Sequence, residues 1–334
     1  MTRGKEKPSE GPLVSIVCTN YNKGTWIRDA IEGFLQQETD FPYEILIIDD
    51  SSSDNSPGII KEFAENYPDK IRAFYNTKNL GITKSWVKIC KEAKGKYIAR
   101  CDGDDYWTDP HKLQVQVEAL EGNPGSAWAN CDFDIVTPDG EVTQEAAFES
   151  GVSVRSYSYE NMLATKGFTM ASTWLVEAKL MLEVNDAIDE NAIDDTFNIQ
   201  LELFHRTELT YIPKSMVAYR VGYESDSHPV DAQKAKQRGD KLLETQIEYV
   251  DKYPEANMTQ ALKLAMNVNN ILEAKLADIG NSLKNANQVI IDQGKVIEDK
   301  SSQLENIYSS KRYKLLTAAA HPINFLGKVR NRLR

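Results

Sequence analysis

Short apolar runs alternate with segments of helical spacing along the first hundred residues. Four apolar runs predict buried strands, at 13–18, 44–48, 71–76 and 97–101. The segments between them place their apolar residues on one helical face, at 26–37, 59–67 and 83–93. Near-continuous apolar strands separated by helices are typical of a parallel, doubly wound sheet. We therefore predict an α/β fold of this kind.

Polar clusters follow three of these strands, at Thr19–Asn22, Asp49–Asp54 and Asp102–Asp105. In such a sheet, ligands bind at the carboxyl ends of the strands. The third cluster carries three carboxylates within four residues, which repel one another unless a cation lies between them. Carboxylate oxygens suit Mg²⁺ or Mn²⁺, often with phosphate oxygens as further ligands. The alternative is a solvated acidic turn, in which Asp and Gly are common.

The pattern loosens after about residue 125. Strands are predicted at 127–136, 168–176 and 210–219, which gives the sheet a mixed character. Asp194 and Asp195 precede an amphipathic helix that carries Phe197, Leu201 and Phe204 at helical spacing.

A different periodicity begins near residue 262. Fourteen positions from Leu262 to Ile307 are spaced three and four residues apart in turn, and eleven of them are apolar. Such a seam over six heptads predicts a coiled-coil helix roughly 70 Å long, although Gly280 and Gly294 weaken it. The alternative is a long helix packed back on the globular part. The coiled coil predicts a homo-oligomer formed through residues 262–307.

Charge is distributed unevenly. The 334-residue chain has a net charge of -11, which argues against a general nucleic-acid binder. Residues 311–334 instead hold seven Lys or Arg and no acid, interleaved with apolar side chains. This composition suits an amphipathic tail on an anionic membrane surface; a flexible tail or a partner-binding segment is the alternative. The four cysteines have no C-x-x-C spacing, and we expect reduced, buried thiols.

Three segments resemble motifs of family 2 glycosyltransferases, in that family's order. Residues 14–22 resemble its opening strand. Residues 47–54 resemble its D-D-G-S-T-D loop, with Ser51 in place of the usual Gly, and residues 95–105 resemble its D-x-D region. The resemblance covers about residues 12–230. It implies a GT-A fold, a nucleotide-diphosphate sugar donor, and direct displacement with inversion at the anomeric carbon.

The resemblance also implies roles for individual residues. Thr19 and Tyr21 correspond to positions that border the nucleotide base, and Asp50 to the carboxylate that accepts a hydrogen bond from uracil. Asp102 corresponds to the carboxylate near the ribose and metal. Asp104 and Asp105 correspond to the pair that holds Mn²⁺ or Mg²⁺ against the diphosphate.

Two later residues complete the expected site. Asp195 lies where the family has the base that takes the proton from the acceptor hydroxyl; capping of the following helix is the alternative. Arg220 resembles a basic residue that binds the diphosphate, and a surface salt bridge is its alternative.

These predictions divide the chain into four regions: a disordered leader at 1–11, a GT-A domain at 12–235, a helical stalk at 236–310 and a basic tail at 311–334. The expected protein is a metal-dependent inverting hexosyl- or deoxyhexosyltransferase of the bacterial surface-polysaccharide type. It would move sugar from a donor, with UDP favoured, to a lipid-linked glycan at the inner face of the cell membrane. The alternative is a non-catalytic sugar-nucleotide-binding scaffold that uses the coiled coil. A dinucleotide dehydrogenase is disfavoured because no G-x-G-x-x-G follows the first strand.

Overall fold

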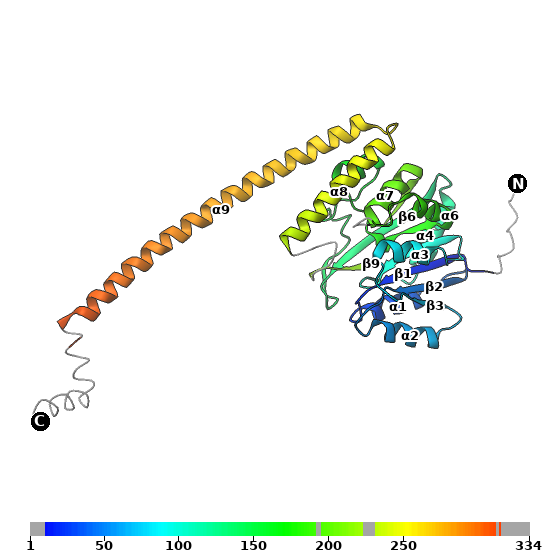
Figure 1. The fold of residues 1–334 in the computed structure, drawn as a ribbon, viewed down its shortest axis with the longest axis horizontal. Coiled ribbons are helices and arrows are strands. Elements are labelled where there is room, and N and C mark those ends of the chain that lie inside the picture. The colour runs from blue at the N-terminus through cyan, green and yellow to red at the C-terminus, as the bar shows by residue number, and fades with distance from the viewer. Residues whose placement is uncertain (1–10, 192–194, 223–230, 312–313, 315–334) are drawn as a thin grey trace, which may run out of the picture. The chain divides into compact units, whose positions relative to one another are not determined.

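The computed structural model describes residues 11–191, 195–222, 231–311 and 314. The predicted leader and basic tail therefore lie almost wholly outside the described residues. The chain divides into two compact units, residues 1–265 and 266–334. Figure 1 shows the first unit as a sheet layered with helices and the second as part of one long helix.

The first half of the larger unit is the predicted α/β arrangement. Its strands are β1 (Val14–Asn20), β2 (Tyr43–Asp49), β3 (Ile71–Tyr75) and β4 (Tyr97–Asp102). Parallel pairing gives the order β3-β2-β1-β4. The connecting helices are α1 (Ile27–Leu35), α2 (Ser56–Asn66) and α3 (Ile82–Cys90). Because these strands run parallel, the polar clusters that follow β1, β2 and β4 meet at one sheet edge.

Alternate residues of the central strands enter two separate cores. Ile16 and Ile45 belong to the core that contains Phe34 of α1. Val17 and Leu46 point the other way, into a core with Trp86 of α3. Burial on both faces explains why these strands are apolar at nearly every position.

The second half adds antiparallel and mixed pairing. Its elements are β5 (Tyr106–Trp107), α4 (Lys112–Gly122), β6 (Ser126–Val136), β7 (Val142–Gln144), α5 (Tyr159–Thr165), β8 (Leu175–Glu177), α6 (Ala178–Ala187), α7 (Asp195–Arg206) and β9 (Glu208–Arg220). The order continues from β4 as β8-β6-β9-β5, and β7 pairs with β6. The long strands β6 and β9 run parallel, with register shifts around Asp132.

The strand predicted at 168–176 is wrong over most of its length. A 3₁₀ helix, η1 (Ala171–Thr173), occupies its centre, and strand pairing begins only at Leu175. Met170 has a positive φ of 50°, and Thr173 Oγ1 donates to the Met170 carbonyl at 2.7 Å. Such local side-chain bonds favour a turn over extended backbone.

Helix α8 (Ala232–Lys252) packs on the larger unit, although the stalk was predicted to begin at residue 236. Its Tyr249 is buried in a third core with Tyr159 of α5 and Leu201 of α7. Glu202 of α7 adds polar contacts, because its carboxylate pairs with Lys252 at 2.7 Å and accepts from the Tyr253 hydroxyl at 2.8 Å.

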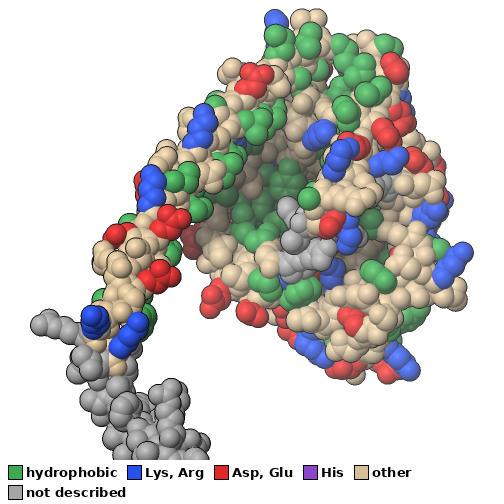
Figure 2. Space-filling view, turned by 60° about the vertical axis from the view of Figure 1, so that its left-hand side comes forward, with side chains coloured by type: hydrophobic (Ala, Val, Ile, Leu, Met, Phe, Trp, Pro, Cys, Tyr) green, Lys and Arg blue, Asp and Glu red, His purple; other side chains and the backbone are tan. Residues whose placement is uncertain are grey.

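The predicted long helix is present as α9 (Met258–Ser309). Its apolar seam is exposed: Leu276 is 67% accessible and Ile297 65%. Figure 2 shows these apolar side chains mixed with charged ones along the helix surface. No second helix covers the seam among the described residues, so the structure does not test the coiled coil. Within the described ranges, we find no helix with the length and hydropathy to cross a bilayer.

Candidate active site

A cavity of about 430 Å³ opens at the sheet edge where the three predicted clusters meet. Its wall includes Thr19, Tyr21, Asp50, Asp102, Asp104, Asp105 and Arg220, together with Lys23 and Tyr219. Seven of the eight predicted site residues therefore line one cavity. Asp195 begins α7, and its side chain lies outside what the structure describes.

The loop after β2 is organised by its two aspartates. Asp49 is a turn residue, because it accepts hydrogen bonds from the Ser52 amide at 2.9 Å and the Asn20 side chain at 2.7 Å. Asp50 is buried and holds the segment before α3: it accepts from the Leu80 and Gly81 amides, each at 2.9 Å. Asn76 donates to the same carboxylate at 2.7 Å. Asp50 thus shapes the cavity wall as well as facing it.

Ser51 shows why related loops carry glycine at this position. Its φ is 63°, in the left-handed region that L-residues with a Cβ adopt at a cost. The loop keeps the conformation that glycine would adopt freely, so the departure from the motif is tolerated with local backbone strain.

Asp102 lies against a buried guanidinium that the sequence analysis did not single out. Arg100, two residues earlier on β4, is 1% exposed and pairs with Asp102 Oδ1 at 3.2 Å. Its guanidinium stacks over Trp86, 4.5 Å from the ring centroid. Thr19 Oγ1 donates to the same carboxylate at 3.1 Å. The signal was present as one arginine inside an apolar strand, at the i, i+2 spacing that shares a sheet face.

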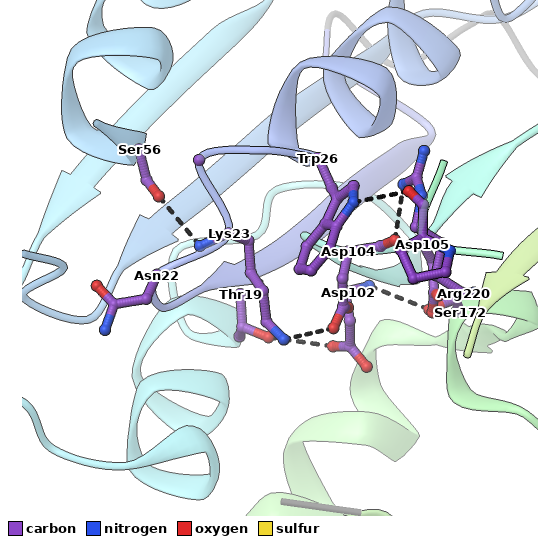
Figure 3. A network of polar contacts seen from close by, with 12 residues as sticks. Thr19, Asn22, Lys23, Trp26, Ser56, Asp102, Asp104, Asp105, Ser172 and Arg220 are labelled. Carbon is purple, nitrogen blue, oxygen red and sulfur yellow. Dashed lines mark hydrogen bonds and ion pairs between the residues drawn. The ribbon is translucent and has the colours of Figure 1, made fainter. Parts of the chain in front are cut away.

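Asp104 and Asp105 do not form a matched pair. Asp104 faces the cavity, where its Oδ2 lies 2.6 Å from Lys23 Nζ (Figure 3). Asp105 is buried, accepting from Ser172 Oγ at 2.6 Å and from the Arg220 amide at 3.2 Å. Burial, and then the Asp104 charge, raise the pKa of Asp105 well above its ordinary value, while the Ser172 bond opposes the shift.

Gly103 allows the acidic loop to approach β1. A Cβ atom there would lie 2.9 Å from Asn20 Oδ1 and 3.3 Å from the Thr19 carbonyl oxygen. The Gly103 amide donates to that carbonyl at 3.1 Å. A larger residue there would displace the Asn20 side chain and crowd the Thr19 carbonyl, whereas glycine leaves both in place.

Arg220, predicted to bind the diphosphate with a surface salt bridge as the alternative, is a buried residue that pairs with the half-exposed Asp29. Its guanidinium donates to the Asp104 carbonyl at 2.8 Å (Figure 3) and also pairs with Asp29 of α1. The Arg220 side chain is 3% exposed, and its Nε is buried without a hydrogen-bond partner. Arg220 therefore supports the acidic loop from beneath while still bordering the cavity.

A second cavity, of about 470 Å³, adjoins the first. Asp102, Asp105 and Tyr219 line both. The rest of its wall comes from distant segments, including Phe168, Ser172, Thr196 at the start of α7, and Arg238 of α8. Trp174 is fully buried in the core and lines neither cavity.

The acidic loop suits a divalent cation that takes some of its ligands from carboxylates and the others from substrate phosphates. Across the described parts of the chain, no three His, Cys, Asp or Glu side chains converge as a complete metal site. Asp102 and Asp104 nevertheless both face the cavity, and the buried Oδ1 of Asn20 beside them has no hydrogen-bond partner in the structure. Magnesium-type ions commonly use one or two carboxylates and take the remaining ligands from substrate phosphates and water.

The comparisons with known proteins agree with this architecture. Residues 15–171 match the model of the family described as glycosyl transferase family 2. The uncharacterized protein Rv1520 of Mycobacterium tuberculosis is 31% identical over 207 residues, which are 62% of this chain and 58% of that protein. This chain thus spans less than two thirds of that relative's length.

Two further proteins extend the comparison. A Bacillus subtilis protein that carries the name of a teichuronic acid biosynthesis glycosyltransferase, TuaG, is 30% identical over 129 residues, 39% of this chain and 50% of that protein. The mannosyltransferase PcManGT from Pyrobaculum calidifontis, solved with GDP-Man and Mn²⁺, superposes with a TM-score of 0.51 at 16% identity, covering 81% of this chain and 84% of that one. That likeness concerns the fold alone, which is GT-A. Residues 15–171, just under half of this chain, thus match glycosyltransferase family 2.

Proposed function

We propose that this protein is a metal-dependent, inverting glycosyltransferase whose two cavities hold donor and acceptor. The observation that carries the proposal is their shared wall of Asp102, Asp105 and Tyr219. A sugar attached to a nucleotide in the first cavity would reach this wall, and a hydroxyl in the second cavity would approach from the other side. Direct displacement needs this opposed arrangement.

The first cavity suits a nucleotide-diphosphate sugar, and we favour a uridine nucleotide. Tyr21 is 46% exposed at the cavity, which leaves its ring available to stack on a base. Asp50 Oδ2 accepts a hydrogen bond from the Gly81 amide, and a carboxylate oxygen can accept a second bond from the uracil N–H. Thr19 lines the wall beside these two residues.

Asp104, with Asp102, would hold Mn²⁺ or Mg²⁺, and Asp105 would support the loop from its buried position. When bound, a divalent ion stabilises the negative charge that develops on the departing nucleoside diphosphate. Arg220 adds a fixed positive charge beneath the same loop, through its bond to the Asp104 carbonyl.

Asp195 would act as the base. As the acceptor oxygen attacks the anomeric carbon, its proton passes to the Asp195 carboxylate, and the bond from that carbon to the diphosphate oxygen breaks. Thr196, the next residue, lines the second cavity, which is consistent with a role at the acceptor. Phe168 lines the same cavity, where an aromatic face can stack on a sugar ring.

The proposed acceptor is a growing cell-surface glycan on a lipid carrier, and the proposed location is the cytoplasmic face of the membrane. The similarity to TuaG, whose name refers to teichuronic acid biosynthesis, supports a polysaccharide acceptor. The basic segment 311–334 supports a peripheral position. Wild type should co-sediment with anionic vesicles, less at high salt, and a chain ending at Ser310 should stay in solution.

The exposed seam of α9 supports a homo-oligomer, most simply a dimer. Apolar residues such as Leu276, Leu283 and Ile290 are more than half exposed along one stripe, and a second copy would cover them. Light scattering on chains ending near residues 255 and 310 tests this. Two monomers would contradict the proposal.

Calorimetry with UDP and Mn²⁺, followed by transfer assays with a panel of nucleotide sugars, tests the function. Asp104→Ala should abolish metal-dependent nucleotide binding, and Asp105→Ala should weaken it strongly. Asp69→Ala, at an exposed site before β3, is the matched control and should bind like wild type. Unchanged affinity in both cavity variants would reject the metal assignment. Absence of donor hydrolysis or transfer with every nucleotide sugar and Mn²⁺ would instead favour the non-catalytic scaffold.

A further inference from the structure

The side chain of Lys23 forms an ion pair with Asp104 at the wall of the first cavity. The Nζ–Oδ2 distance is 2.6 Å, and both side chains remain partly exposed to the cavity, at 24% and 15%. Figure 3 shows the lysine side chain reaching from its loop toward the acidic residues. Its ammonium therefore sits at the carboxylate that the proposed function assigns to a divalent cation.

The Lys23 backbone is held in place although its side chain is long. The Lys23 amide donates to Ser56 Oγ at 3.1 Å, and the Gly24 amide donates to Asp54 Oδ2 at 2.7 Å. On the other side, the Asn22 amide donates to Ser52 Oγ at 2.9 Å. A fixed Cα with a flexible four-carbon stem lets the ammonium move between nearby partners without moving the loop.

The other charged groups at this wall are held by more rigid contacts. Asp102 pairs with the buried Arg100, and Arg220 with Asp29. Asp105 is bonded to Ser172 and to a backbone amide. Lys23 thus differs from Arg100 and Arg220, because its charged end is partly exposed and able to change partner.

We propose that Lys23 exchanges with the divalent cation at Asp104. In the nucleotide-free protein, Lys23 neutralises Asp104; when a cation occupies that carboxylate, repulsion releases Lys23, and its ammonium moves to the diphosphate oxygens of the donor. The inference rests on the proposed function, since it assigns Asp104 to the cation. It makes Lys23 a positioning residue that couples metal binding to nucleotide binding.

The exchange has a signature that a purely structural salt bridge lacks. Removing the Lys23 charge should strengthen binding of Mn²⁺ alone, because the ion no longer competes with an ammonium. The same change should weaken UDP binding at saturating Mn²⁺, because the diphosphate loses a charge-assisted bond. Opposite effects on the two ligands are therefore expected.

The test is Mn²⁺ binding by electron paramagnetic resonance, with and without UDP, on the full chain. In Lys23→Met, affinity for Mn²⁺ alone should rise about two- to fivefold, the scale of a partly exposed ion pair. Affinity for UDP at saturating Mn²⁺ should fall about tenfold. Lys23→Arg keeps the charge and should stay near wild type in Mn²⁺ binding.

Lys61→Met is the matched control, since Lys61 is 70% exposed and pairs with Glu65 on α2, away from the cavity. It should leave both affinities unchanged. Unchanged or weaker Mn²⁺ binding in a folded Lys23→Met protein would overturn the exchange. UDP binding by both proteins with Mn²⁺ binding by neither would also overturn it, while leaving nucleotide recognition in the proposed function intact.

Discussion

The two cavities of this protein are built from different kinds of chain segment. The first is made mainly by loops that follow β1, β2 and β4, so its polar residues come in short clusters directly after apolar strands. Besides the shared Asp102 and Asp105, the second draws on several segments between Ile135 and Leu242, most of all on residues 166–172. The residues of the first cavity can therefore be predicted from local sequence motifs, whereas those of the second depend on how distant segments pack.

The two cavities are also expected to serve different functions. Changes confined to the first cavity should alter nucleotide binding. Changes at the second should alter transfer while nucleotide binding persists. Substitutions in each cavity, and in the core next to them, test whether nucleotide binding and sugar transfer can be altered separately.

The largest expected effect is at the base. Asp195→Asn should keep the affinity for UDP and Mn²⁺ but lower the rate of transfer by about 10²- to 10⁴-fold, because the acceptor hydroxyl loses its proton acceptor. Calorimetry and single-turnover assays measure the two properties separately. Asp186→Asn, at an exposed position of α6, is the control. Turnover near wild type would move the role to another residue, with Asp194 the first to test.

Arg100→Met should damage the first cavity and the fold together. The substitution removes the buried partner of Asp102 and the guanidinium between Trp86 and Trp174. We expect the free energy of unfolding to fall by about 3–4 kcal/mol, as for other buried ion pairs that lose one partner, and UDP affinity to fall with it.

Urea denaturation measures the effect of Arg100→Met. Arg28→Met is the matched control: it breaks an exposed pair with Glu62 and should cost less than about 1 kcal/mol. Equal losses of unfolding free energy in the two variants would show that the buried ion pair of Arg100 contributes no more than an exposed one.

Lys112 should give the protein a distinctive stability at alkaline pH. The side chain is fully buried on α4, bonded to Gln116 at 2.7 Å, and burial lowers its pKa to about 8 from 10.5. Below pH 8 both folded and unfolded chains carry the charge, so the cost of burying it is fully present. Between pH 8 and 10.5 the folded lysine loses its proton before the unfolded one does, so this residue's contribution to stability rises.

Lys112→Met should remove that rise, which we expect to be about 2–3 kcal/mol. The difference between wild-type and variant unfolding free energies, measured by urea denaturation from pH 7 to 10.5, isolates it from the cysteines, whose raised pKa values act in the opposite direction. A difference that stays constant across this range would show that Lys112 has the same pKa in the folded protein as in the unfolded chain.

Ser51→Gly should have the smallest effect. Glycine adopts the φ of 63° without the Cβ penalty, although it also adds freedom to the unfolded chain. We expect a net gain of about 0.5 kcal/mol in stability with UDP affinity unchanged. A loss of stability in thermal unfolding would show that the serine side chain contributes a contact that exceeds the strain.

Local patterns were sufficient for most of the fold's first half. The apolar runs predicted the four parallel strands to within two residues at each end, because strands buried on both faces must be apolar throughout. They failed at 168–176, where Thr173 Oγ1 donates to the carbonyls of Thr169 and Met170 and the chain turns. The helical pattern from residue 236 did not indicate that α8 docks on α5 and α7 through its buried Tyr249.

The sequence by itself determined which residues gather at the strand ends, because parallel strands bring the polar clusters after them to one edge whatever surrounds them. Thr19, Tyr21, Asp50, Asp102 and Asp104 could be named on that ground together with the family resemblance. Only the tertiary structure decided what each carboxylate contacts. Lys23 on Asp104 and Ser172 on Asp105 join segments 81 and 67 residues apart, and side-chain contacts over such separations follow from packing rather than from any local period. Arg100 on Asp102 is the exception, because the two residues share a face of β4 at i, i+2 spacing.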